Sequence, residues 1–159
     1  MNENKSALPA SDAERALGTA LNILAYAECT EAALRRKLRD KGYDEESAEF
    51  AIDYVVKHRY LDEKRYLYRL VEYLSNNRLY GRRRSAVALR EKGFSQKNVS
   101  LYFEDALSTV DERENCKKAL SKIKKDSDKK TVDALLRRGF LYGDIKAAMQ
   151  EQSEEEYFD

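Results

Sequence analysis

The stretch LRDKGY at residues 38–43 recurs as LREKGF at residues 89–94 and, more loosely, as LLRRGF at residues 135–140. Each copy is typical of a helix C-terminus. Basic residues favour the negative end of the helix dipole, and glycine suits the left-handed position that ends many helices. The aromatic residue that follows can fold back on the helix. The three glycines are 51 and then 46 residues apart, which predicts one supersecondary unit copied three times.

Upstream of each copy, apolar residues recur with the i, i+3, i+4, i+7 spacing of a buried helix face. The three sets are Leu17, Ala20, Leu21 and Leu24; Leu67, Leu70, Val71 and Leu74; and Cys116, Ala119, Leu120 and Ile123. We therefore expect an all-α fold of tandem three-helix repeats. Because each unit is too small for a generous core, the repeats should stack into an elongated, curved right-handed or mixed helical array. A compact nine-helix globule is the competing arrangement.

Capping residues indicate where the helices begin. Ser11 with Glu14 forms a capping-box pattern, and further N-caps are expected at Thr30, Asp44, Asp62, Ser95, Asp111 and either Ser127 or Asp128. The expected segments are a flexible N-terminal arm at 1–10, repeats at 11–61, 62–110 and 111–150, and an acidic C-terminal tail at 151–159 that frays.

Composition narrows the class of protein. The chain has 159 residues, of which 37% are charged and 42% hydrophobic, with six glycines and a single proline. So few chain breakers argue against an all-β fold, and the hydrophobic share argues against disorder. The two cysteines stand far apart and show neither a metal spacing nor a disulfide framework. The first six residues lack an apolar segment, and no apolar run approaches ~20 residues. We expect no signal peptide, no membrane contact and a reducing, cytoplasmic location.

Charge is segregated along the chain, and the middle repeat is basic. Residues 62–110 carry ten Lys/Arg and six Asp/Glu, whereas residues 144–159 carry one and six. The sharpest local feature is NNRLYGRRRS at residues 76–85, where an aromatic residue, a glycine and three arginines open a helix. Arginine forks match phosphates, and a helix N-terminus adds unpaired N–H groups. The cations oppose the helix dipole, so helix stability alone does not call for them. They form either a solvated surface run or a contact with nucleic acid or an acidic protein surface.

The predicted interaction surface lies on the second repeat. Arg65 and Arg69 are four residues apart and share one helix face. The full predicted set for partner and DNA binding is Arg65, Arg69, Tyr80, Arg82, Arg83, Arg84, Arg90 and Lys92. A second basic run, at residues 117–130, reads mainly as a solvated helix face.

Signs of catalysis are missing from the sequence. Phosphate-cradling glycine loops, a nucleophile elbow and a His-Glu-x-x-His pair are all absent. His58 and Cys116 read as structural residues. We expect no catalytic, cofactor-binding or metal-ligating residue, no enzymatic activity, and a monomer, because no long exposed apolar run offers a dimer seam.

Four motifs in order, YLDEKRY at 60–66, Tyr80-Gly81, Arg84 and the KGF of 92–94, resemble the RecX family of bacterial regulators of the RecA recombinase. The resemblance covers about residues 12–150. Many members have Gly-Pro-x-Arg where this chain has GRRR at 81–84. The resemblance implies tandem three-helix repeats that lodge in the groove of the RecA–single-stranded DNA filament, usually inhibiting strand exchange, ATP hydrolysis and co-protease activity, without a cofactor. Two alternatives stay open: a stand-alone nucleic-acid-binding protein, and a helical adaptor unrelated to RecA.

Overall fold

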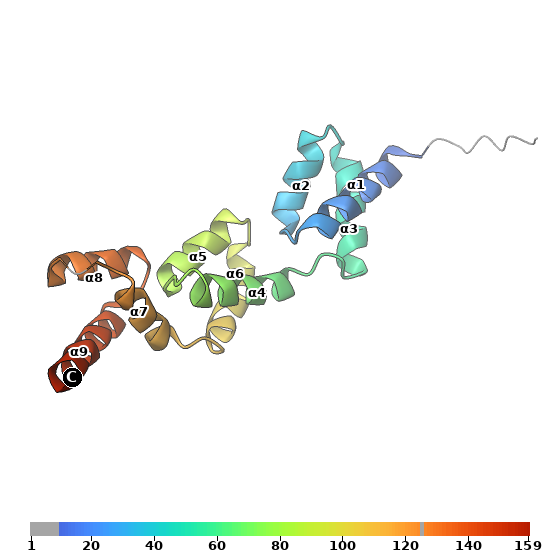
Figure 1. Ribbon diagram of the computed structural model, residues 1–159. Helices are drawn as coiled ribbons and strands as arrows, with labels where there is room; N and C mark the ends of the chain where they lie inside the picture. The colour runs from blue at the N-terminus through green and yellow to red at the C-terminus, as the bar shows by residue number, and fades with distance from the viewer. Residues whose placement is uncertain (1–9, 125) are drawn as a thin grey trace, which may run out of the picture. The chain divides into compact units, whose positions relative to one another are not determined.

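The computed structural model describes residues 10–124 and 126–159 (Figure 1). Within these ranges the chain forms nine α-helices and no strand, so the prediction of an all-α helical repeat fold is confirmed. The helices are α1 (Asp12–Tyr26), α2 (Glu31–Asp40), α3 (Glu45–Lys57), α4 (Glu63–Asn76), α5 (Arg82–Glu91), α6 (Gln96–Leu107), α7 (Glu112–Ser121), α8 (Asp128–Arg137) and α9 (Tyr142–Phe158). Apart from Ala10, the arm expected at residues 1–10 lies outside the described residues.

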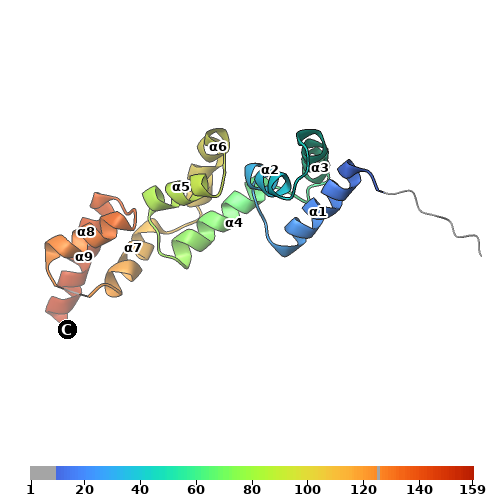
Figure 2. The same cartoon turned by 90° about the horizontal axis from the view of Figure 1, so that it is seen from above.

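The chain divides into two compact units, Met1–Glu63 and Lys64–Asp159. The first unit holds α1 to α3 together with the first residue of α4. The second unit holds the other two groups of three helices. Within the second unit, the start of α5 lies beside the end of α8 (Figure 2). None of the helices in the described ranges is long and apolar enough to cross a membrane.

The predicted capping residues and glycines begin and end the helices. Six of the predicted N-caps accept a backbone N–H into their side chains: Ser11, Thr30, Asp44, Ser95, Asp111 and Ser127. All three landmark glycines have a positive φ, of 93°, 97° and 91°. In each repeat the N–H of the aromatic residue after the glycine donates to a leucine carbonyl five residues back, at 3.2 Å. The repeated motif is therefore a helix-ending turn, as its composition predicts.

Each unit buries the apolar faces that the sequence pattern predicts. In the first unit, α1 packs on α3, and the fully buried residues include Ala20, Leu34 and Leu38. The second unit has two clusters. One joins α4, α5 and α6 around Leu67 and Leu89, and the other joins α7, α8 and α9.

One member of the second cluster comes from outside its own repeat. Leu79 follows α4, yet its side chain is buried with Cys116, Leu135 and Phe140. Leu79 has a φ of 52°, which is uncommon for a residue other than glycine. Burying Leu79 in the third repeat fastens the loop between α4 and α5 onto α7 to α9.

The acidic C-terminal stretch differs from the expectation of a frayed tail, because α9 continues through it to Phe158. Lys117 of α7 forms an ion pair with Glu151, and the Ser153 hydroxyl donates to the Met149 carbonyl at 3.0 Å. These contacts hold the middle of α9. Its last turn carries Tyr157 and Phe158, which are both exposed.

Candidate functional site

The start of α5 is held by backbone contacts to the C-terminal end of α8. The Gly81 N–H donates to the Arg138 carbonyl at 2.7 Å. The Arg83 N–H donates to the Gly139 carbonyl at 3.2 Å. A Cβ added to Gly81 would lie 2.3 Å from the Gly139 carbonyl carbon, and one added to Gly139 would lie 2.3 Å from the Arg84 nitrogen. Both positions therefore require glycine, and we call this contact the glycine joint.

The glycine joint also explains why α5 tolerates cations at its start. Gly81 is the N-cap of α5 and makes no side-chain capping bond. The carbonyls of Arg138 and Gly139, which follow the last residue of α8 at the partially negative end of that helix, lie against the first turn of α5. The negative end of α8 thus offsets the three arginines, which the sequence of α5 alone leaves unfavourable.

Arg82 is occupied by ion pairs within the chain. Its guanidinium makes two bonds to Glu112, Nε to Oε1 at 3.0 Å and Nη2 to Oε2 at 2.7 Å, and a third to Glu104 at 3.1 Å. The bond to Glu112 raises the pKa of Arg82. Arg82 therefore ties α5 to α6 and to the start of α7. Removing the Arg82 side chain is therefore expected to affect folding, because its loss leaves two carboxylates without this partner.

Arg78 and Arg84 lie around Tyr80, and Arg83 is exposed next to Arg84 in the first turn of α5. The Arg84 guanidinium lies 4.0 Å from the centre of the Tyr80 ring, and that of Arg78 lies 5.5 Å away. Arg78 also donates to the Tyr80 hydroxyl at 3.1 Å. Arg138 reaches over from α8 and donates to the Arg78 carbonyl at 3.0 Å. We call Arg78, Tyr80, Arg83, Arg84 and Arg138 the basic cluster.

The basic cluster overlaps the predicted site without matching it. Tyr80, Arg83 and Arg84 belong to both sets, whereas Arg78 and Arg138 are not among the residues predicted from the sequence. Arg138 has a visible signal, since it directly precedes the third landmark glycine. That it lies beside residues 78–84 depends on tertiary packing, which the repeat spacing does not reveal.

The other predicted site residues lie apart from the cluster. Arg65 and Arg69 are exposed in the first half of α4, whereas the cluster follows the end of that helix. Arg90 and Lys92 are exposed at the far end of α5. At 1.5 Å per residue, Arg90 lies about 12 Å along the axis from the start of the helix.

The two cysteines are placed in the packing of the fold, and the single histidine at the end of a helix. Cys116 is fully buried, and this burial raises the pKa of its thiol to about 11. Burial also raises the pKa of the Cys29 thiol. His58 ends α3 with its ring centre 4.2 Å from that of Tyr54. In residues 10–124 and 126–159, no group of three His, Cys, Asp or Glu side chains is placed to hold a metal ion.

Comparison with known proteins identifies the architecture. Residues 16–54 match the family described as RecX, first three-helix domain. A crystal structure of RecX from Lactobacillus salivarius superposes with a TM-score of 0.77 at 24% identity, covering 88% of this chain and 96% of that one. At this level of identity the superposition shows a shared fold. The chain thus has the fold of a class of proteins built from three-helix repeats.

Sequence relatives show the family itself. The chain is 30% identical to "Regulatory protein RecX" of Trichlorobacter lovleyi, over 77% of this chain and 81% of the relative. It is 32% identical to the protein of the same name from Clostridium botulinum strain Alaska E43, over 82% of this chain. It spans 65% of the length of that clostridial relative. The chain belongs to the RecX family of regulatory proteins.

Proposed function

We propose that this chain modulates the RecA recombinase by binding the RecA–single-stranded DNA filament in its groove, and that it inhibits recombinase, ATPase and co-protease activities. Membership of the RecX family supports the choice of partner. The observation that carries the proposal is the basic cluster, where exposed arginines from one repeat are fixed in place by the backbone of the next.

The geometry of the cluster suits phosphate contact. Arg83 and Arg84 are exposed, and their backbone is fixed by the glycine joint. Stacking on Tyr80 orients the Arg84 guanidinium, so less side-chain freedom is lost when it meets a phosphate. Arg82 acts as a positioning residue through its carboxylate partners. Arg65, Arg69, Arg90 and Lys92 extend the surface along α4 and α5 in this proposal.

The test is the ATPase activity of RecA on single-stranded DNA, measured with the full chain added. The wild-type chain should lower the rate, and the double variant Arg83→Ala/Arg84→Ala should lose most of this effect. Loss of two phosphate contacts should reduce the salt slope of filament binding by about 1.4, at about 0.7 per contact on single strands. Both side chains are exposed, so thermal unfolding should change by less than about 0.5 kcal/mol.

The matched control is Lys122→Ala/Lys124→Ala, which removes two exposed cations from the third repeat. Lys125, which directly follows Lys124, lies outside the described residues. If the lysine variant loses RecA inhibition and the arginine variant keeps it, the proposed surface is wrong. Equal affinity for bare DNA and for the filament would favour a stand-alone nucleic-acid-binding protein, and an effect on neither would favour an adaptor.

A further inference from the structure

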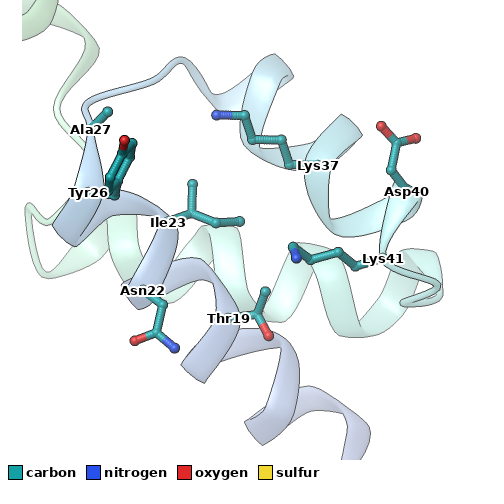
Figure 3. Close-up of a pocket in the computed structure, with 8 residues that line it drawn as sticks. All are labelled: Thr19, Asn22, Ile23, Tyr26, Ala27, Lys37, Asp40 and Lys41. Atoms are coloured by element: carbon teal, nitrogen blue, oxygen red, sulfur yellow. The ribbon is translucent and has the colours of Figure 1, made fainter.

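A cleft between α1 and α2 lies in the first unit and shares no residue with the basic cluster (Figure 3). Its volume is about 680 Å³. Sites for small ligands typically measure ~300–1,000 Å³. The α1 side contributes Asn22, Ile23 and Tyr26, and the α2 side contributes Lys37 and Lys41. The cleft is therefore large enough for a nucleotide. Its α1 side carries an aromatic and an aliphatic side chain among polar ones, and its α2 side carries two lysines and Asp40.

Tyr26 is the most exposed of the large hydrophobic residues in the described ranges, at 94%. It is the last residue of α1, and Figure 3 shows its ring at one end of the cleft, next to Ala27. A ring this exposed adds little to the core of its own unit. Its faces can accept a flat partner, with Ile23 extending the apolar surface beside it.

The opposite wall carries two cations one helical turn apart. Lys37 and Lys41 are four residues apart, so their side chains leave the same face of the helix end. In Figure 3 both ammonium groups extend toward the α1 side, whereas the Asp40 carboxylate points away from it. Among residues 10–124 and 126–159, neither lysine has an ion-pair partner. The lysines thus have ammonium groups that a ligand in the cleft can engage.

We propose that this cleft binds a segment of single-stranded nucleic acid, with one base stacked on Tyr26 and the adjoining phosphates on Lys37 and Lys41. An aromatic platform beside a cationic track is the arrangement that holds single strands, because every base has a flat face and every linkage a negative charge. A duplex keeps its bases stacked on one another and cannot offer one to Tyr26. The proposal rests on the proposed function only for the source of the strand, which the filament supplies; the site itself is separate.

An acidic peptide with an aromatic side chain is the competing occupant. The nucleic acid is favoured because its negative charges repeat along the backbone, so one strand can engage both lysines. A peptide would need acidic side chains at the right positions in its sequence to do the same. The two occupants are separated by the experiment.

The experiment measures fluorescence anisotropy of a labelled twelve-residue oligothymidylate with the full chain, over a series of salt concentrations. Tyr26→Ala should weaken binding at least fivefold, and Tyr26→Phe should restore it, because stacking needs the ring and not the hydroxyl. The matched control is Tyr157→Ala, which removes another exposed tyrosine from the second unit. The double variant Lys37→Ala/Lys41→Ala should lower the salt slope by about 1.4.

Three results would overturn the proposal. The first is an oligothymidylate affinity of Tyr26→Ala equal to that of Tyr157→Ala, or no binding by the wild-type chain. The second is that Tyr26→Ala weakens the binding of a hairpin duplex as much as it weakens the binding of the oligothymidylate. The third is displacement of the oligonucleotide by the peptide EEEYFD at comparable concentration, which would assign the cleft to acidic peptides.

The basic cluster is tested apart from the cleft. Repeating the titrations in the Arg83→Ala/Arg84→Ala background removes two exposed arginines of the basic cluster, and the Tyr26→Ala effect should persist there. If the arginine variant abolishes the RecA effect while Tyr26→Ala changes nothing, the proposed function stands and the cleft proposal fails. If Tyr26→Ala weakens oligonucleotide binding while no variant affects RecA, the reverse holds.

Discussion

The second helices of the first two repeats, α2 and α5, occupy equivalent places but begin in different ways. The hydroxyl of Thr30 accepts the Ala33 N–H at 3.1 Å, and the Glu63 carboxylate accepts the Glu31 N–H at 2.8 Å. Side chains of its own unit therefore satisfy the start of α2. The start of α5 has no side-chain cap and relies on the carbonyl ends of α8 instead.

This difference parallels the division of the chain into two compact units. The start of α2 is satisfied by side chains within the first unit, although one of them, Glu63, is also the first residue of α4. A helix capped by the next repeat is complete only when that repeat is folded, and the second and third repeats share one unit. The basic cluster also forms only when both repeats are folded, because Arg138 belongs to the third repeat and Arg84 to the second.

Giving α5 a side-chain cap like that of α2 should have the largest effect. Serine is a better N-cap than glycine in an isolated helix, so local propensity predicts that Gly81→Ser stabilises the fold. The glycine joint predicts the opposite, because the added Cβ would lie 2.3 Å from the backbone of Gly139 and Phe140. We expect a loss of about 3 kcal/mol, in the upper range of overpacking costs, measured by urea unfolding.

Two controls separate the effect of the close backbone contact at the glycine joint from the effect of a positive φ at a helix-ending glycine. Gly42 has a positive φ of 93° but open space around it, so Gly42→Ala should cost only about 1 kcal/mol, in the first unit. Thiol labelling at low urea reports where each variant opens, since each unit contains one buried cysteine. Gly81→Ser should speed the labelling of Cys116 and leave Cys29 unchanged. Stabilisation by Gly81→Ser would contradict the inference that the glycine joint leaves no room for a side chain at residue 81.

Local features of the fold follow from sequence, and the joint does not. The caps at Thr30 and Asp44 depend on residues within four positions of each other, so a sequence pattern can predict them. Gly42 ends its helix for the same local reason. The pairing of Gly81 with Gly139 joins residues 58 positions apart, and neither carries a side chain whose chemistry would signal the contact.

The candidate site divides in the same way. The exposed arginines at 83 and 84 are visible in the sequence as a basic run, whereas the partners of Arg82 are 22 and 30 residues away. Three consecutive arginines look equivalent in sequence because only packing against α6 and α7 distinguishes the first from the others. In the first unit, the cleft at Tyr26 depends on how α1 and α2 pack, which the apolar spacing does not specify.

Removing the cap of α2 should have an intermediate effect. Thr30 is fully buried, and Thr30→Ala leaves the Ala33 N–H without its acceptor. Loss of a threonine cap typically costs ~0.5–2 kcal/mol, and we expect about 1.5 kcal/mol here because water reaches the site poorly. Thiol labelling should now be faster at Cys29 and unchanged at Cys116, the reverse of the Gly81→Ser result. Thr30→Ser, which keeps the acceptor oxygen, should lose less; an equal loss would show that the methyl group matters and the cap does not.

Removing the Arg82 side chain should have the smallest effect of the three. Its pair with Glu112 is geometrically good but partly solvated, with side-chain exposures of 30% and 22%, so Arg82→Ala should cost about 1 kcal/mol. Arg83→Ala, the adjacent exposed arginine, should cost less than about 0.5 kcal/mol. Arg82→Lys should recover only part of the loss, because an ammonium cannot form the two parallel bonds to Glu112.

A double-mutant cycle assigns the loss to its partners. The coupling of Arg82→Ala with Glu112→Ala should exceed its coupling with Glu104→Ala, since the Glu104 side chain is 73% exposed and well screened by water. Raising the salt concentration should weaken both couplings, that with Glu104 more strongly. Equal couplings would mean that Arg82 acts by bulk charge compensation at the start of α5. In that case Arg82 would be as available to phosphate as Arg83 and Arg84.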